Sequence, residues 1–471
     1  MRLVGREDEQ RQLREYAAAD EPDFVVVYGR RRVGKTFLVR EVFDDRFTFY
    51  ATGLMGGSKA EQLAEFNRAL NRYGTREFPP AADWLTAFWQ LRDLVEADPR
   101  LGKKVIFLDE MPWMDTPKSK FLMGLEAFWN GWASGRADIL LVVCGSAAAW
   151  ITRKLFRNRG GLYNRVTHRI WLRPFTLQET EALLAARGIV FSRLQIAETY
   201  MVFGGIPHYL CQLERGLSPA QNVDRLCFAR GAPLRDEFDQ LYASVFAQAQ
   251  RHVDVVEAIG RKNRGLTRDE IIAATRLTDG GSLSRVLDEL ERSDLLRRYY
   301  GFGKRERDSL YQLSDPFSHF ALRFLRSGAV TDENYWANDD TSGARNAWRG
   351  YAFEQVCLAH LPQIKAKLGI SGVATTTASW LGQRDGQKAQ IDLVLARRDG
   401  VINLCEMKFA DREYEITKAY ADRLRQQRWA FADHAPKSAA LHTTLVTPYG
   451  VKRNIHWSEV QAEVTLDDLF A

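Results

Sequence analysis

One short segment constrains the fold of this chain more than any other. Residues 29–36, Gly-Arg-Arg-Arg-Val-Gly-Lys-Thr, fit the pattern GxxxxGK followed by Ser or Thr. An apolar run, 24–28, precedes them, and a helix is predicted over 37–43. A strand, a glycine-rich loop and a helix in this order are the context that a phosphate-binding loop requires. The segment therefore predicts an α/β fold built around a nucleotide site.

Each part of this loop has a physical role. The glycines let the backbone bend, so that successive N–H groups point at phosphate oxygens. The Lys35 ammonium can reach the β- and γ-phosphates, and the Thr36 hydroxyl can bind Mg²⁺. We therefore expect ATP and Mg²⁺ to bind at Gly29, Arg32, Val33, Gly34, Lys35 and Thr36.

Polar residues follow two further strands that the sequence predicts. Apolar runs cover 47–50, 105–108 and 139–143, and such short strands between helical stretches favour a parallel sheet with helices on both faces. Asp109 and Glu110 follow the second run, and Ser146 follows the third. An Asp at a strand end can hold Mg²⁺, and a following Glu can polarise the attacking water. We expect Asp109 to bind metal, Glu110 to be catalytic and Ser146 to contact the γ-phosphate.

Length and composition set the broad class of protein. At 471 residues, the chain predicts about three domains. Hydrophobic residues make up 45% and charged residues 27%, which excludes a mainly disordered chain. Neither a secretory leader nor an apolar run of about 18 residues is visible, so we expect a cytoplasmic protein without membrane contact. The net charge of +6 permits an anionic partner such as nucleic acid but does not require one.

Cysteine usage points to the same compartment. Five cysteines is an odd number, and none has CxxC spacing. We interpret them as reduced thiols rather than as a disulfide framework or a zinc site. They are Cys144, Cys211, Cys227, Cys357 and Cys405.

The middle of the chain predicts a winged helix-turn-helix. Helices are expected over 252–261 and 281–290, with a Thr-x-x-Glu capping box at 267–270 between them. Two strands, 295–300 and 310–313, would form the wing. Groups that could contact DNA are Ser282, Ser284 and Arg285 on the third helix and Lys304, Arg305 and Arg307 on the wing.

Charge leaves the role of this module open. Residues 251–330 carry a net charge of only +3, from 15 Lys and Arg against 12 Asp and Glu. Acidic residues on the third helix, Asp288, Glu289 and Glu291, also oppose binding to a duplex. Contact with DNA and a structural arm both stay open as interpretations.

Three charged residues near the C-terminus depend on the geometry of one turn. Strands are expected on either side of Arg398-Asp-Gly400. A two-residue turn would pair position 392 with 407, and Asp392 and Glu406 would then lie on opposite faces. A three-residue loop with a left-handed Gly400 pairs 392 with 406 instead. Asp392, Glu406 and Lys408 then share one face, because side chains alternate along a strand.

Such a cluster has a chemical use. Two carboxylates can hold Mg²⁺ or Mn²⁺ through hard oxygen ligands. The metal can activate water and balance charge on a scissile phosphate, while a lysine positions or stabilises the reacting groups. The sequence therefore names Asp392, Glu406 and Lys408 as candidates for phosphodiester hydrolysis.

The first half of the chain resembles P-loop ATPases of the AAA+ and STAND group, and in particular the archaeal-type ATPases. Besides the phosphate loop, the likeness includes Val4-Gly-Arg6-Glu7, the run from Leu108 to Trp113 and the run from Arg173 to Glu179. It also includes Gly204-Gly-Ile-Pro207, which is similar to the GxP element of STAND ATPases. The resemblance covers most of the chain. It implies that Arg6 lies near the adenine and that a helical lid brings Pro207 to the nucleotide.

The same resemblance raises the question of an arginine finger. In AAA+ relatives, an arginine in the stretch between the strand at 139–143 and the Pro-Phe run at 174–175 reaches the γ-phosphate of a neighbouring subunit, which raises the rate by orders of magnitude. Four arginines lie in the corresponding stretch, and Arg165 is our candidate, the others being Arg157, Arg159 and Arg169. A basic surface loop is the alternative, because STAND proteins often lack a finger. Assembly into a homo-oligomer is left open with it.

The C-terminal cluster resembles the PD-(D/E)xK nuclease superfamily. Asp392 is followed, after thirteen residues, by Glu406-x-Lys408. The helix around 351–356 resembles the first helix of that fold, and Glu354 its extra acid, which would add a metal ligand. Gln390 stands near the place where a Pro-Asp pair is usual, so the match departs from the common pattern there. Nuclease-like domains are recurrent C-terminal partners of archaeal-type ATPases, and this likeness covers about 346–450.

Together these patterns predict an α/β protein with a P-loop parallel sheet and helical lid, a winged helix-turn-helix and a C-terminal α/β restriction-endonuclease-like domain. The predicted bounds are 1–180 for the ATPase core, 181–250 for the lid, 251–330 for the winged helix, 331–345 for a linker and 346–471 for the nuclease-like domain. We expect an ATPase coupled to a DNA-binding, metal-dependent nuclease. The alternatives are a signalling or scaffold ATPase and a DNA-binding regulator that does not cleave.

Overall fold

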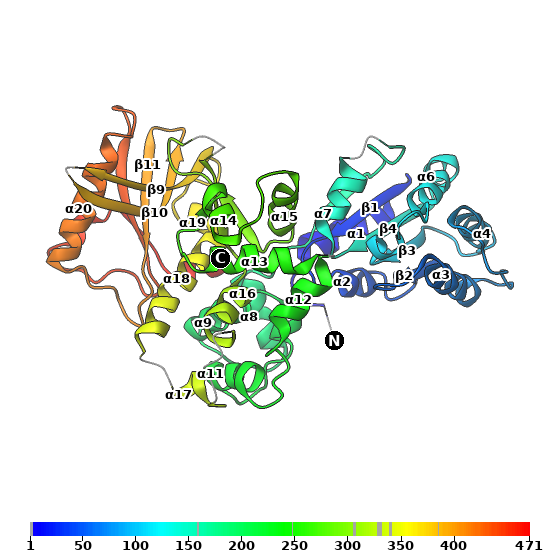
Figure 1. Cartoon of the computed structure of the whole chain (residues 1–471), viewed down its shortest axis with the longest axis horizontal. Coiled ribbons are helices and arrows are strands. Elements are labelled where there is room, and N and C mark those ends of the chain that lie inside the picture. The colour runs from blue at the N-terminus through cyan, green and yellow to red at the C-terminus, as the bar shows by residue number, and fades with distance from the viewer. Residues whose placement is uncertain are drawn as a thin grey trace. The chain divides into compact units, whose positions relative to one another are not determined.

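The structure, a computed structural model, describes residues 3–157, 160–246, 248–304, 308–326, 332–338, 342–384 and 386–471. The chain divides between Pro174 and Phe175 into two compact units. Figure 1 labels the elements of both. Within these ranges, no helix has the length and apolar character needed to cross a bilayer.

A parallel five-stranded sheet forms the centre of the first unit. Its strands are β1 (Asp23–Tyr28), β2 (Phe49–Thr52), β3 (Lys104–Asp109), β4 (Ile139–Gly145) and β5 (His168–Trp171), in the order β2-β3-β4-β1-β5. The four predicted strands are confirmed within a few residues. β5 was not predicted, because it is an edge strand in which only Ile170 is buried.

Helices cover this sheet and bury its apolar side chains. They are α1 (Glu7–Ala18), α2 (Lys35–Val42), α3 (Lys59–Tyr73), α4 (Trp84–Glu96), α5 (Met111–Met114), α6 (Phe121–Gly131) and α7 (Ala148–Ile151). Trp84, Phe66 and Phe121 meet edge to face or tilted in one aromatic cluster between α3, α4 and α6. These rings belong to a hydrophobic core that also contains Phe49 of β2 and Leu108 of β3, the residue before Asp109.

The second unit begins with a bundle of helices. These are α8 (Leu177–Ala186), α9 (Arg193–Phe203), α10 (Pro207–Leu210), α11 (Pro219–Val223) and α12 (Glu237–Val245). Gly205 lies so close to the backbone of Phe175 that a β-carbon there would be 1.9 Å from its carbonyl oxygen. The Phe175 N–H donates to the Gly205 carbonyl at 2.6 Å. A residue with a side chain would therefore not fit at position 205, two residues before Pro207.

A three-helix segment with a small sheet follows, and we call it the three-helix segment throughout. It contains α13 (Ala249–Gly260), α14 (Arg268–Thr275), α15 (Gly281–Arg292) and the strands β6 (Leu266–Thr267), β7 (Leu296–Tyr299) and β8 (Leu310–Leu313), ordered β6-β8-β7. The predicted capping box is present, since Thr267 and Glu270 bond each other's backbone. The predicted apolar face of α15 is also buried. Arg305 and Arg307, predicted as phosphate contacts, lie outside the described residues.

The stretch predicted as a linker contains ordered structure where it is described. After α16 (Pro316–Phe320), the helix α17 (Tyr335–Asn338) packs through Trp336, which is 4% exposed, against Phe324 and Trp348. The Asp224 carboxylate accepts the N–H groups of Trp336 and Ala337 at 2.7 and 2.9 Å. The polar composition of 331–345 thus predicted a linker although Trp336 in this stretch is buried against other parts of the chain.

The C-terminal domain, residues 343–471, is a five-stranded mixed sheet with helices. It contains α18 (Gly343–Ala359), α19 (Leu361–Lys367), β9 (Thr375–Arg384), β10 (Gln387–Arg397), β11 (Val401–Met407), α20 (Lys418–Ala432), β12 (Ala440–Val446) and β13 (Ala462–Val464). The order is β13-β12-β11-β10-β9, with β9, β10 and β11 antiparallel and β12 parallel to β11. In Figure 1, β9, β10 and β11 lie side by side next to α20.

A buried histidine joins this domain to the helical bundle. His360, at the end of α18, accepts the Leu177 N–H at 2.9 Å through Nε2, and its Nδ1 meets the Val356 carbonyl at 2.8 Å. These contacts require a neutral ring. Burial lowers the pKa of His360 to about 4, with the Val356 carbonyl acting in the opposite direction.

We predict that the second unit loses stability in acid because of this histidine. The pKa of His360 is lower in the folded chain than the value near 6.5 of an unfolded chain, so the neutral ring contributes its full stability above pH 6.5. This contribution, up to roughly 3 kcal/mol of the free energy of unfolding, is lost as the pH falls from 6.5 toward 4. Chemical unfolding of the native chain and of H360Q at pH 7.5 and pH 5 measures this loss. The native chain should lose more stability than H360Q, and equal losses would contradict the prediction. His319, whose pKa burial also lowers to about 4, keeps part of the pH dependence in the variant.

Candidate nucleotide and carboxylate sites

The phosphate loop joins β1 to α2 and has the backbone that its sequence requires. Gly29 has φ +145°, and a β-carbon there would lie 2.2 Å from the Leu172 carbonyl oxygen. Gly34 has φ +92° and caps the N-terminus of α2. Lys35 is 5% exposed, and its Nζ donates to the carbonyls of Gly29 and Arg30 at 3.1 and 2.9 Å. Its ammonium therefore lies within the curve of the loop, where phosphates bind in such motifs.

The predicted magnesium ligands of this site meet in the structure. The Thr36 hydroxyl donates to the Asp109 carboxylate at 3.0 and 3.1 Å. β4 separates β1 from β3, but parallel strands present their carboxyl ends at one edge of a sheet, so the two side chains still converge there. A hydroxyl and a carboxylate are oxygen ligands suited to Mg²⁺.

Glu110 and Ser146 are also brought together at this edge. The Glu110 carboxylate accepts two hydrogen bonds from Ser146, one from its N–H at 3.1 Å and one from its side-chain hydroxyl at 2.9 Å. Glu110 has φ +44°, so its backbone turns away from β3 in the left-handed region. The interaction fixes the carboxylate beside the phosphate loop, where a residue that orients water must lie. The catalytic role of Glu110 stays a prediction.

Cys144 is a residue of this site that the sequence analysis did not single out. Its Sγ lies 2.5 Å from Asp109 Oδ1 in the interior of the unit. Burial raises the pKa of the Cys144 thiol, and Asp109 and Glu110 raise it further. The group is therefore a neutral thiol that donates to Asp109. The sequence feature that could have indicated Cys144 is its position near the end of β4, two residues before Ser146.

Three further predicted residues have defined places but untested roles. Arg6 has φ 62° and precedes α1, and its Nη2 donates to the Arg173 carbonyl at 2.5 Å, so the two family-like segments touch. Arg165 is exposed in the turn before β5. Pro207 is the first residue of α10 in the second unit. The adenine contact of Arg6, the finger role of Arg165 and the lid role of Pro207 stay predictions.

In the C-terminal domain, the turn between β10 and β11 has the predicted three-residue geometry. Leu393 pairs with Cys405 and Ala396 with Ile402, a register that places 392 opposite 406. Gly400 has φ +86°, the left-handed conformation that this loop requires. The prediction that depended on this turn is confirmed.

The register brings the charged residues together as expected. Lys408 Nζ lies 3.1 Å from Glu406 Oε2 and 3.6 Å from Asp392 Oδ2. Burial, and after it the negative charge of Asp392, raise the pKa of Glu354 on α18 to about 8. That influence places the third carboxylate in the same electrostatic environment. Of the two sequence alternatives, only the shared face is consistent with these contacts.

Two uncharged side chains of α20 complete this cluster. Gln427 Nε2 donates to Glu406 Oε1 at 3.0 Å, and the Tyr420 hydroxyl donates to Glu406 Oε2 at 3.4 Å. Burial raises the pKa of Glu406, and the Asp392 charge adds to the effect while Lys408 opposes it. Neither residue could be found from the sequence, because α20 has no motif and reaches the cluster only through the tertiary fold.

The carboxylates nevertheless do not form a ready-made metal cage. Within the described ranges, no group of three or more His, Cys, Asp or Glu side chains is arranged to share a metal ion. The lysine ammonium lies against Asp392 and Glu406 instead. The chemistry of these oxygen donors fits a divalent cation. Of the predicted ligands in this domain, Asp392 and Glu406 are the two that contact the same lysine.

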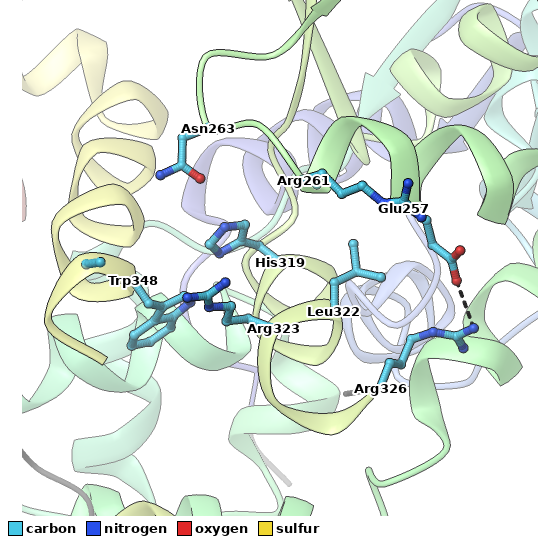
Figure 2. A pocket seen from close by; sticks show the side chains of 10 residues that line it. Glu257, Arg261, Asn263, His319, Leu322, Arg323, Arg326 and Trp348 are labelled. Atoms are coloured by element: carbon cyan, nitrogen blue, oxygen red, sulfur yellow. Dashed lines mark hydrogen bonds and ion pairs between the residues drawn. The ribbon is translucent and has the colours of Figure 1, made fainter. Parts of the chain in front are cut away.

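A separate cavity of about 450 Å³ lies between α13, α16 and α18. Figure 2 shows Arg323 beside His319 and Trp348, whereas Arg261 extends toward Glu257. Glu257 in turn pairs with Arg326 at 2.9 Å. The guanidinium groups thus do not converge on a common point, and we assign no ligand to this cavity.

The strand order and the phosphate loop define a P-loop nucleotide-binding fold. A comparison with known protein families is consistent with this class. Residues 3–213 match the family described as "ATPase domain predominantly from Archaea". Residues 3–213 are thus similar to archaeal-type ATPase domains, and the protein is an ATPase.

Longer similarities extend beyond this domain. An uncharacterized protein of Methanocaldococcus jannaschii is 22% identical over 444 residues, or 93% of this chain and 95% of the relative. A solved Walker-type ATPase of Pyrococcus abyssi is 18% identical with a TM-score of 0.50, over 68% of this chain and 96% of that one. The Aeropyrum pernix ORC2 protein is 12% identical with a TM-score of 0.45, over 68% and 92%. The Pyrococcus structure supports the fold.

We predict that E110Q binds ATP but hydrolyses it at least about 100-fold more slowly, because the amide cannot polarise the attacking water. Phosphate release and the affinity for a fluorescent ATP analogue measure the two effects separately. E41Q, an exposed change on α2, is the matched control and should behave as the native chain. Hydrolysis by E110Q at the native rate would remove Glu110 from the catalytic set.

Proposed function

We propose that this protein is an ATPase whose C-terminal domain cleaves phosphodiester bonds in nucleic acid with Mg²⁺ or Mn²⁺. One observation carries the proposal: the β10–β11 register places Lys408 within 4 Å of both Asp392 and Glu406. Two carboxylates and a lysine on adjacent strands are a set that metal-assisted hydrolysis uses. An ordinary solvated sheet surface would not bury such charges, and Glu406 is 2% exposed.

The order of elements supports the same proposal. α18 is followed by the antiparallel strands β9, β10 and β11, then by α20 and the parallel strand β12. This order agrees with the resemblance to PD-(D/E)xK nucleases, in which the first helix supplies an extra acid. Glu354 on α18 is close enough to Asp392 for their charges to interact.

Each side chain has a role in this proposal. Asp392 and Glu406 would hold the metal, with Glu354 as a further acid. The bound metal would supply activation of water and balance of charge on the scissile phosphate. Lys408 would stabilise negative charge on the phosphate oxygens, and Gln427 keeps the Glu406 carboxylate oriented through its 3.0 Å hydrogen bond.

The ATPase half would regulate this activity. ATP and Mg²⁺ would bind at the phosphate loop, with Thr36 and Asp109 on the metal and Glu110 on the water. Hydrolysis would change the position of the lid that contains Pro207, or the assembly of subunits through Arg165, and so position the C-terminal domain on DNA. The hydrogen bond between Thr36 and Asp109 supports the nucleotide part of this scheme.

A second function is favoured by one observation. Because Lys408 lies against the two carboxylates and no three-residue metal group is present in the described part of the chain, the C-terminal domain would also suit a silent module. The protein would then be an ATP-switched scaffold or a DNA-binding regulator.

We predict that the purified protein cuts DNA in Mg²⁺ or Mn²⁺ and that K408A cuts at least about 100-fold more slowly, because the phosphate loses its cation. K388A, an exposed change on β10 of the same sheet, serves as the control. Gel analysis of plasmid and oligonucleotide substrates, with and without ATP, measures cutting. Well-folded protein that hydrolyses ATP and cuts neither substrate would favour the silent module.

A further inference from the structure

The hairpin of the three-helix segment is attached to the C-terminal domain. The Phe302 N–H donates to the Ser379 carbonyl at 2.8 Å, and Gly301 forms an isolated bridge with Ser379. The Phe302 ring lies 4.9 Å from Phe431 in the hydrophobic cluster of the C-terminal sheet. The hairpin thus extends the free edge of β9, which is the last strand in the sheet order. This end of the predicted wing is engaged within the protein.

A cavity of about 370 Å³ lies between the two partners of this contact. One wall comes from the three-helix segment and includes Arg264, Arg297 and Tyr299. The opposite wall includes Tyr351 and two of the predicted metal ligands, Glu354 and Asp392. These two acids therefore line a space that the C-terminal domain does not enclose alone.

Of the two arginines in this wall, Arg297 is the one that contacts α18. Its Nη2 donates to Gln312 Oε1 at 2.7 Å and to Gln355 Oε1 at 2.6 Å, so it joins β7 to α18. Gln355 directly follows Glu354, and the Arg297 charge acts on that carboxylate. A planar guanidinium held in this way is suited to bind a phosphate oxygen pair.

We propose that the three-helix segment forms one wall of the catalytic cavity and restricts the substrate to an unpaired nucleotide, whose phosphate faces Arg297. This inference rests on the proposed nuclease function and names its substrate class. The cavity has the size of a small-ligand pocket, about 300–1,000 Å³, which a base-paired segment cannot enter. Tyr299 offers an aromatic ring to the base, a contact that single-strand sites use. A single strand also enters such a pocket without the cost of unpairing.

The first test measures binding in EDTA, so that nothing is cut. Fluorescence anisotropy compares a labelled single strand with a blunt duplex of the same sequence on the full-length protein. We expect the single strand to bind at least about tenfold more tightly, and R297A to lose about tenfold of that affinity. R298A, whose side chain points to the other face of β7, is the control and should bind as the native chain. Equal affinity for both DNAs, or equal effects of R297A and R298A, would overturn the inference.

The second test locks the wall in place. Gly301→Cys with Ser379→Cys would form a disulfide across the observed bridge. The oxidised protein should keep the preference for single strands, in binding and in cutting, because the wall is part of the site. Loss of binding on oxidation and its return on reduction would mean that the wall must leave, which overturns the inference. A single-strand preference in binding without cutting by any variant would instead contradict the nuclease function and leave the wall intact.

Discussion

The contact of one lysine with the buried Glu406 and the partly exposed Asp392 is the interaction on which the C-terminal half depends. Burying an ionised carboxylate is costly unless a cation compensates for the lost water. Lys408 supplies such a charge to Asp392 and Glu406, and burial alone would lower its pKa, yet these two carboxylates raise it. Burial raises the pKa of Glu354, and the Asp392 charge raises it further. The oxygen atoms of these carboxylates are ligands that would stabilise a divalent cation.

The nucleotide site solves a related problem with a different scaffold. Parallel strands bring Asp109, Glu110 and Ser146 to the edge where the phosphate loop begins. There, Lys35 supplies positive charge, while Thr36 donates to Asp109, the predicted metal ligand. The two halves thus share one arrangement, in which acids at strand positions face a cation. In both, the register of the sheet decides whether the residues meet.

Local sequence predicted those registers better than it predicted contacts between segments. Gly400 was decisive, because only a left-handed residue allows the loop that pairs 392 with 406. The strand β5 escaped prediction because its solvent-facing residues hide the pattern. Trp336 could not be placed from a polar stretch, since its partners lie elsewhere in the chain. The attachment of Phe302 to Phe431 was invisible for the same reason.

Binding of Mn²⁺ to the nucleotide-free protein tests the central claim, that Asp392 and Glu406 form a divalent-metal site. Electron paramagnetic resonance counts free Mn²⁺ during a titration and needs no substrate or turnover. We expect one bound ion per chain, absent from D392N but retained by D399N, a change in the exposed turn of the same hairpin. Equal Mn²⁺ binding by the native chain and D392N, or none by either, would contradict this claim.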